Sequence, residues 1–74
     1  MAFTAWAADT AFSVGDVRRA TTVQNSGLVF RCTVAGTSAS SEPSPWPAIR
    51  GLTIEDGTCT WVAVTAVGEE LNKL

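Results

Sequence analysis

The sequence predicts a small all-β module, an antiparallel sheet or barrel-like fold built from two hairpins. Three observations lead to this prediction: runs rich in Val, Thr and aromatic residues, turn-forming Asn-Ser-Gly and Asp-Gly segments between them, and a proline-rich middle that excludes helix. With 74 residues the chain makes one thin domain, whose single core rarely contributes more than about 3–5 kcal/mol.

Residues 1–13 carry Phe3, Trp6 and Phe12, mostly among Ala and Thr residues. This spacing fits neither the helical nor the strand period well. We therefore expect residues 1–13 to form an N-terminal arm or a partly helical lead-in, and residues 14–65 to form the β domain.

The first hairpin is expected from two β-prone runs, residues 17–23 and 28–35. They are joined by a Gln-Asn-Ser-Gly segment that tolerates positive φ. The second run alternates, which places one set of side chains on the core face and the other on the solvent or partner face. The core set is Leu28, Phe30, Cys32 and Val34, and the other set is Val29, Arg31 and Thr33.

Residues 37–47 are rich in Ser and then contain all three prolines of the chain, so they predict an extended surface loop around Trp46. Three roles are open for Trp46. It closes one end of the core, it anchors a protein contact, or it forms a platform on which a sugar ring stacks.

The second hairpin is expected from residues 52–55 and 58–65, with Asp56-Gly57 as a two-residue type I′ turn. In the last strand one face carries Cys59, Trp61 and Ala63, and the other carries Thr60, Val62 and Val64. Because both faces are fairly apolar, this strand is expected to be central or covered on its second side.

The last segment, residues 66–74, is expected to be a C-terminal arm. It can form a single helical turn with Leu71 and Leu74 on one edge, and such an edge can dock on a neighbour. Fraying is the alternative, because a helix this short is unstable alone.

The chain lacks the residues that catalysis requires. It has no histidine and no tyrosine, and its only lysine is Lys73, so Cys32 and Cys59 have no nearby base to make a nucleophilic thiolate. We expect no enzyme activity, no cofactor and no metal site. The two cysteines are interpreted as buried thiols, with a disulfide as the alternative if their strands are neighbours.

Charge is also scarce, at 16% of residues and a net charge of −2. Arg18 and Arg19 are consecutive in a strand and point to opposite faces, which breaks any basic patch. We therefore expect no nucleic-acid or membrane partner. The start of the chain has no basic segment followed by an apolar run, so synthesis in a cytoplasm is expected.

A series of short motifs runs through residues 6–64. It comprises Trp6, Phe12-Ser13-Val14-Gly15-Asp16-Val17, Gly27-Leu28-Val29-Phe30-Arg31-Cys32, Ala35-Gly36-Thr37-Ser38, Glu42-Pro43, Trp46-Pro47 and Asp56-Gly57-Thr58-Cys59-Thr60-Trp61. The series resembles the small β modules of tailed-bacteriophage structural proteins. Those modules are themselves similar to chitin-binding modules of chitinases.

The resemblance implies a non-enzymatic virion protein made in the cytoplasm of a bacterial host. With the module as the whole protein, it implies most directly a capsid decoration (cement) protein on the capsid surface. Such a protein binds the major capsid protein lattice, copies of itself, or both, and can be an oligomer.

Two alternatives are a carbohydrate-binding or host-adhesion module with a glycan partner, and a tail or head-completion subunit. The absence of tyrosine and of adjacent surface aromatics ranks the glycan partner second. The residues expected to contact a partner are Phe3, Trp6, Arg31, Trp46, Leu71 and Leu74.

Overall fold

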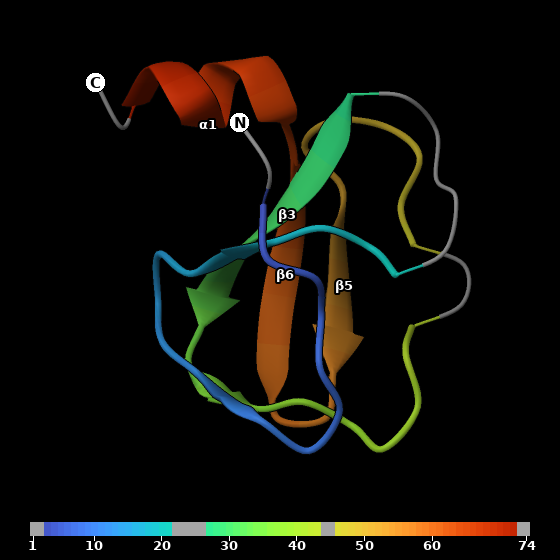
Figure 1. Cartoon of the computed structure of the whole chain (residues 1–74). Helices are drawn as coiled ribbons and strands as arrows, with labels where there is room; N and C mark the ends of the chain where they lie inside the picture. The colour runs from blue at the N-terminus through green and yellow to red at the C-terminus, as the bar shows by residue number, and fades with distance from the viewer. Residues whose placement is uncertain (1–2, 22–26, 44–45, 73–74) are drawn as a thin grey trace.

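The computed structural model describes residues 3–21, 27–43 and 46–72, which form two antiparallel sheets and one short helix (Figure 1). The larger sheet has the order β2-β3-β6-β5, and the smaller sheet pairs β1 with β4. The elements are β1 Ala11–Phe12, β2 Val17–Arg18, β3 Leu28–Val34, β4 Gly36–Thr37, β5 Thr53–Asp56, β6 Cys59–Thr65 and α1 Ala66–Asn72. The predicted all-β module with two hairpins, β2–β3 and β5–β6, is confirmed, and its larger sheet has β2 and β5 at its edges.

The two longest strands, β3 and β6, pair along the middle of the larger sheet. On one side, here called the core face, Phe30 and Cys32 of β3 lie with Trp61 and Ala63 of β6, and all four are fully buried. The predicted alternation of β6 is confirmed, and so is its central position. The central position gives β6 a hydrogen-bonded strand at each edge, and of its two faces one is buried while Val62 and Val64 on the other are half-buried.

A β-bulge near the end of β3 reverses the predicted position of Val34. Cys32 lies opposite Trp61, but the register then shifts and Val34 lies opposite Thr60. Because Thr60 faces away from the core, Val34 does too, and it is 51% exposed. The prediction of Val34 as a core residue is wrong because one extra residue in the strand changes the alternation.

The turn of the second hairpin lies one residue later than predicted. Asp56 pairs with Cys59, so the two turn residues are Gly57 and Thr58. Gly57 has φ +62°, whereas Thr58 does not have a positive φ. A positive φ at the first turn residue only is the pattern of a type II′ turn, not of type I′. Asp56 is thereby released from the turn and ends β5 as a buried residue.

The first strand of the first hairpin is shorter than predicted. Only Val17 and Arg18 pair with β3, and Arg19 instead forms a parallel bridge with Ala5. The backbone of Arg19 exchanges hydrogen bonds with Thr4 and Trp6, both at 2.9 Å. The predicted turn residues Gln24, Asn25 and Ser26 lie outside the described residues.

Residues 3–13 lie against the β domain and do not project from it. Phe3, Trp6 and Phe12 are all buried, and β1 pairs with β4. In Figure 1 this segment crosses in front of the larger sheet. The expectation of an arm is wrong for these residues because Trp6 and Phe12 pack in the core cluster and Phe3 is also buried. Their spacing follows no strand or helix period since most of the segment has neither structure.

The core face is covered by aromatic side chains from outside the larger sheet. Trp6, Phe12, Ala20 and Trp46 pack with the buried residues of β3 and β6, and Leu28 and Ile54 add to the edge of this cluster. The predicted proline-rich loop, residues 37–47, begins one residue later than predicted because Thr37 belongs to β4, and its other described residues, 38–43 and 46–47, contain no helix or strand. This loop brings Trp46 to the core.

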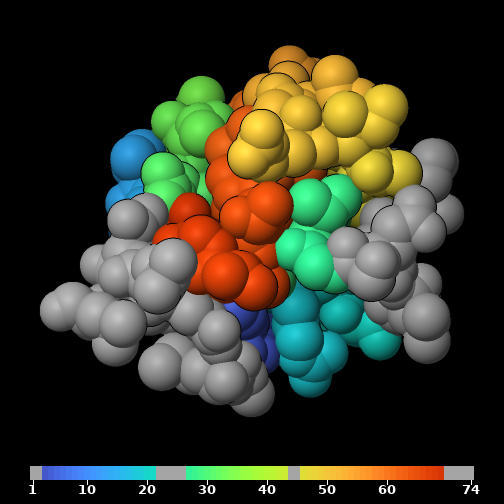
Figure 2. Space-filling view, turned by 90° about the horizontal axis from the view of Figure 1, so that it is seen from above, coloured from blue at the N-terminus to red at the C-terminus, as the bar shows by residue number. Residues whose placement is uncertain are grey.

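The helix α1 follows β6 directly, at the end of the sheet where β3 begins (Figure 1). The amide of Ala66 donates to the carbonyl of Gly27 at 2.7 Å, which ties the start of α1 to the start of β3. Seen from above, α1, the start of β3 and the loop before β5 share this end of the molecule (Figure 2). The helix is longer than the single turn predicted.

Candidate partner-binding site

The structure places Trp46, one of the predicted contact residues, in the core. It is 4% exposed, its ring stacks on Phe30 at 4.2 Å between centroids, and it meets Trp61 edge-on at 6.3 Å. Its indole N–H donates to Oε2 of Glu42 at 2.9 Å. Of the three roles considered, Trp46 has the first, closing the core. It offers no stacking platform to a ligand.

Glu42 holds this loop to the chain that follows β2. Its carboxylate accepts from both the backbone amide and the hydroxyl of Thr21 as well as from Trp46. Burial acts to raise the pKa of Glu42, but the hydrogen bonds from Thr21 and Trp46 outweigh burial and the pKa is lowered. The charged form of Glu42 is therefore the one that fixes the loop.

Trp6, a second predicted contact residue, is held inside the domain by Asp56. The carboxylate of Asp56 accepts from the indole N–H of Trp6 at 2.7 Å and from that of Trp61 at 3.0 Å. Its other oxygen accepts from the amide of Ala39 at 2.9 Å. Asp56 is 2% exposed, so a single buried carboxylate joins the N-terminal segment, β6 and the proline-rich loop.

Phe3, Trp6 and Trp46 are thus predicted contact residues that the structure buries within one chain. Phe3 lies outside the main core cluster but is only 9% exposed, and its carbonyl accepts from Nε of Arg19 at 3.1 Å. Assigning these three to a partner surface is wrong for the folded chain, because a thin domain uses its large aromatics to complete its own core.

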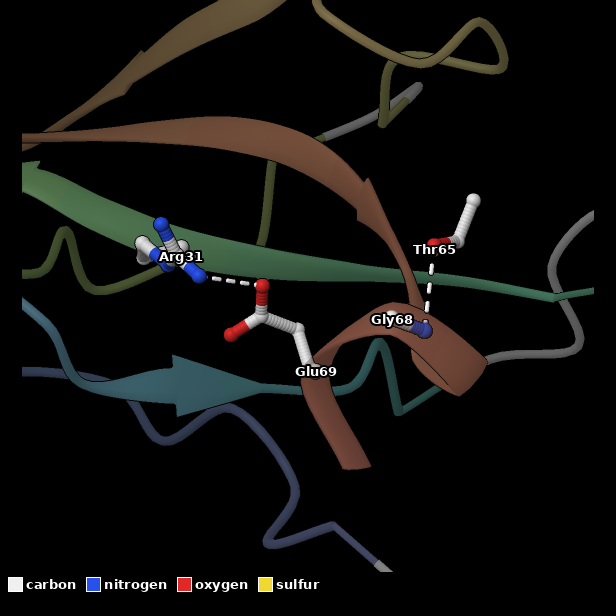
Figure 3. A network of polar contacts seen from close by, with 4 residues as sticks. All are labelled: Arg31, Thr65, Gly68 and Glu69. Carbon is white, nitrogen blue, oxygen red and sulfur yellow. Dashed lines mark hydrogen bonds and ion pairs between the residues drawn. The ribbon is translucent and has the colours of Figure 1, made fainter. Parts of the chain in front are cut away.

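Arg31 is the predicted contact residue that remains at the surface. It projects from β3 toward Glu69 of α1 and forms an ion pair with it (Figure 3). The Glu69 side chain is 9% exposed and that of Arg31 is 38% exposed. The hydrogen bond from Arg31 to Glu69 raises the pKa of Arg31 further above its ordinary value. Arg31 therefore stays charged and partly open to solvent.

Leu71 and Leu74 complete the predicted set. Leu71 lies in the last turn of α1, where only the backbone is described, and Leu74 lies outside the described residues. Their role in contacting a partner stays a prediction.

The side of the larger sheet opposite the core face, here called the outer face, is weakly charged and rich in β-branched residues. The register places on it Val17, Val29, Arg31, Val34, Thr53, Glu55, Thr60, Val62 and Val64. Only Arg31 and Glu55 carry charge. Val29 is buried, whereas Val62 and Val64 are half-buried and Val34 is exposed. An open sheet face of this composition loses little hydration free energy when another surface covers it.

An open groove of about 570 Å³ borders the outer face beside Arg31. The turn before β2 contributes Val14 and Gly15, and α1 contributes Glu69. Val14 is 66% exposed. The turn itself is fixed by Asp16, whose carboxylate accepts from the amide of Ser13 at 2.9 Å. The groove therefore combines an exposed apolar side chain, a charged guanidinium and rigid walls.

The two cysteines are free thiols in the core, the first of the two alternatives considered. Burial raises the pKa of Cys32, and it raises the pKa of Cys59 from 9.0 to about 11. Their side chains donate to the carbonyls of Val34 and Asp56. Both thiols are thereby kept protonated and poorly nucleophilic at neutral pH.

In the described part of the chain, no group of three His, Cys, Asp or Glu residues could hold a metal ion. Among the same residues, no helix has the length and apolarity needed to cross a membrane.

The residues that organise the site were not singled out by the sequence. Asp56 was interpreted as a turn residue, and Glu42 and Glu69 were assigned no role. Buried charge leaves no local pattern, because its partners are far apart in the sequence: Trp6 and Asp56 are separated by 50 residues. The sequence shows only that its tryptophans need hydrogen-bond acceptors when they are buried. It does not show which carboxylates accept from them.

Comparisons with protein-family models, with curated proteins and with solved structures found no match to this chain.

Proposed function

We propose that this chain is a non-enzymatic structural protein of a virion, a capsid decoration (cement) protein that binds the major capsid protein lattice and stabilises the particle. The observation that supports the proposal most is the outer face. It is a sheet surface with two charged residues, β-branched side chains and an exposed Val34. A weakly charged sheet surface of this kind suits attachment to a large, regular lattice better than it suits capture of a small molecule.

The rigidity of the domain supports the same proposal. Aromatic rings of four separate segments meet in the core, and the indole N–H groups of Trp6, Trp46 and Trp61 all donate to buried or half-buried carboxylates. A domain fixed in this way presents its outer face with little loss of entropy on binding. The phage-module resemblance supplies the identity of the lattice.

The tail or head-completion role is the same kind of attachment at a different place on the particle. The carbohydrate-binding role rested on Trp46 and on the likeness to chitin-binding modules, and the burial of Trp46 leaves it with the likeness alone.

Particle binding tests the proposal. Particles of the source virus that lack this protein should bind the purified chain and become more resistant to heat. Val34→Glu places a charge on the outer face and should weaken binding about tenfold or more, since a buried unpaired charge is costly at an interface. Ser40→Glu adds the same charge to the exposed proline-rich loop and is the matched control.

Binding by Ser40→Glu should equal that of the wild type. Equal binding by Val34→Glu, or particles whose heat resistance is unchanged by the protein, would count against the proposal. If labelled protein binds to the particle only at the tail, the result would favour the alternative that the chain is a tail subunit.

A further inference from the structure

The edge of the larger sheet at β5 carries backbone groups without partners in the described chain. β5, Thr53–Asp56, pairs with β6 on one side, and no described strand lies on its other side. Both Thr53 and Glu55 are exposed. Such an edge is a template for pairing with another strand.

The hydrogen-bond pattern shows which groups point outward. Ala63 donates to the carbonyl of Leu52 at 2.9 Å, and antiparallel partners alternate between bonded and non-bonded pairs. Ile54 and Asp56 therefore bond to β6, whereas the N–H and C=O groups of Thr53 and Glu55 point to the free edge. Among the described residues, no hydrogen bond to these four groups comes from another part of the chain.

We infer that two copies of this chain pair through β5, antiparallel and about a twofold axis at Ile54. In this register Thr53 of one copy lies opposite Glu55 of the other, so all the outward groups of both residues are used. A register shifted by one step brings Glu55 opposite its own copy, and like charges in that position are destabilising. The inferred register thus pairs all the outward groups and keeps the two Glu55 side chains from facing each other.

The surroundings of β5 favour a second copy as the occupant. The strand contains no proline, lysine or bulge, and its protection against edge pairing is limited to its short length and its acidic residues. Exposed apolar side chains precede it, with Ile49 65% and Leu52 50% exposed. Since the strand is short, the dimer is weak in solution and is strengthened where copies are concentrated side by side.

This inference goes beyond the proposed function, because it adds a second copy of the chain as a partner, and its test needs no particles. In the inferred dimer the two Ile54 residues face each other as a non-bonded pair, with Cα atoms about 4.5 Å apart. This distance suits a disulfide. Ile54→Cys should therefore form a disulfide-linked dimer under mild oxidation, and the native thiols should not compete because Cys32 and Cys59 are at most 1% exposed.

The register is tested by two matched variants. Thr53→Cys alone and Glu55→Cys alone should link at least several-fold less than Ile54→Cys, because each faces a different residue of the second copy. A mixture of Thr53→Cys and Glu55→Cys should form the linked heterodimer.

The reversible dimer is tested with Thr53→Pro. It removes an outward N–H from each copy but none that bonds to β6, so circular dichroism should report an intact fold. Sedimentation equilibrium of the wild type should show a mass that rises with concentration, and Thr53→Pro should raise the dimer Kd about tenfold or more. A wild type that stays monomeric, or Ile54→Cys that links no better than Thr53→Cys, would overturn the inference while leaving the particle-binding proposal standing.

Discussion

Asp56 shows how one side chain can organise a domain with little core. Its carboxylate is 2% exposed and accepts hydrogen bonds from Trp6, Trp61 and Ala39, which belong to three segments of the chain. Burying a carboxylate is costly unless it is hydrogen-bonded, and bonds to a charged acceptor are about twice as strong as neutral ones. The carboxylate therefore fixes the two indoles in place instead of weakening the core.

Asp56→Asn tests this role, because it keeps the size of the side chain but replaces one acceptor oxygen by a donor. The free energy of unfolding should fall by about 2–4 kcal/mol, as measured by urea denaturation. Glu55→Gln, at the exposed neighbouring position, should change it by no more than about 0.5 kcal/mol.

If Asp56→Asn does not fold at 25 °C, Trp6→Phe provides a milder probe, since it removes one donor and leaves an aromatic ring. Trp6→Phe should lower the free energy of unfolding by less than Asp56→Asn does. If Asp56→Asn is as stable as the wild type, the hydrogen bonds from the indoles make no net contribution to the free energy of unfolding.

At the scale of the elements, the second hairpin depends on a close approach between its turn and β4. Thr58 donates to the carbonyl of Thr37 at 3.0 Å. A Cβ added at Gly57 would lie 2.2 Å from that same carbonyl oxygen. The turn therefore needs glycine both for its positive φ and for the space beside β4.

Gly57→Ala should destabilise the protein by more than about 2 kcal/mol, because strain at positive φ adds to a collision with backbone. Gly15→Ala separates the two effects, since Gly15 also has a positive φ but a Cβ there meets no atom within 4 Å. Gly15→Ala should lower the free energy of unfolding by only about 1 kcal/mol in the same urea experiment. A smaller loss for Gly57→Ala than for Gly15→Ala would contradict the close approach.

The sequence predicted the strands that have a local pattern. It did not predict the positions of segments that are determined by contacts between residues far apart in the chain. The faces of β6 and most of β3 followed from alternation, because side chains in a regular strand must alternate. The bulge at Val34 has no sequence signature of its own. The N-terminal segment was misassigned because Trp6 and Phe12 are placed by the core cluster that they join, not by a repeat of their own.

The candidate site was predicted less well than the fold. Large aromatics indicate both cores and interfaces, and only the tertiary structure shows that Trp6 and Trp46 are in the core. Arg31 was placed correctly on the face away from the core, since alternation determines that position. Its partner Glu69 could not be predicted, because it approaches from a helix 38 residues later.

For the whole molecule, burial of the thiols makes stability depend on alkaline pH. The pKa of Cys59 is 9.0 ordinarily and about 11 in the folded protein. As pH rises, the unfolded chain therefore loses this proton before the folded chain does, and the folded state loses stability. The contribution is fully present below pH 9 and is lost as pH rises through about 11.

Urea unfolding between pH 8 and 11 should show this decline, with Cys59 contributing about 2–3 kcal/mol of it. Cys59→Ala should be less stable at pH 8 but should have a shallower decline with pH. The chain has no tyrosine and a single lysine, so few other groups titrate in this range. An equal decline in Cys59→Ala would assign the effect to another group.

The bulge in β3 lets this strand change its length without moving its core residues. Thr33 is the extra residue of the bulge, so its deletion would leave Cys32 opposite Trp61 and Val34 opposite Thr60 in a regular register. Changes in length are usually tolerated in loops. In this sheet the loss of one residue inside a strand would be absorbed at the bulge, with Val34 still on the outer face and the core residues in place.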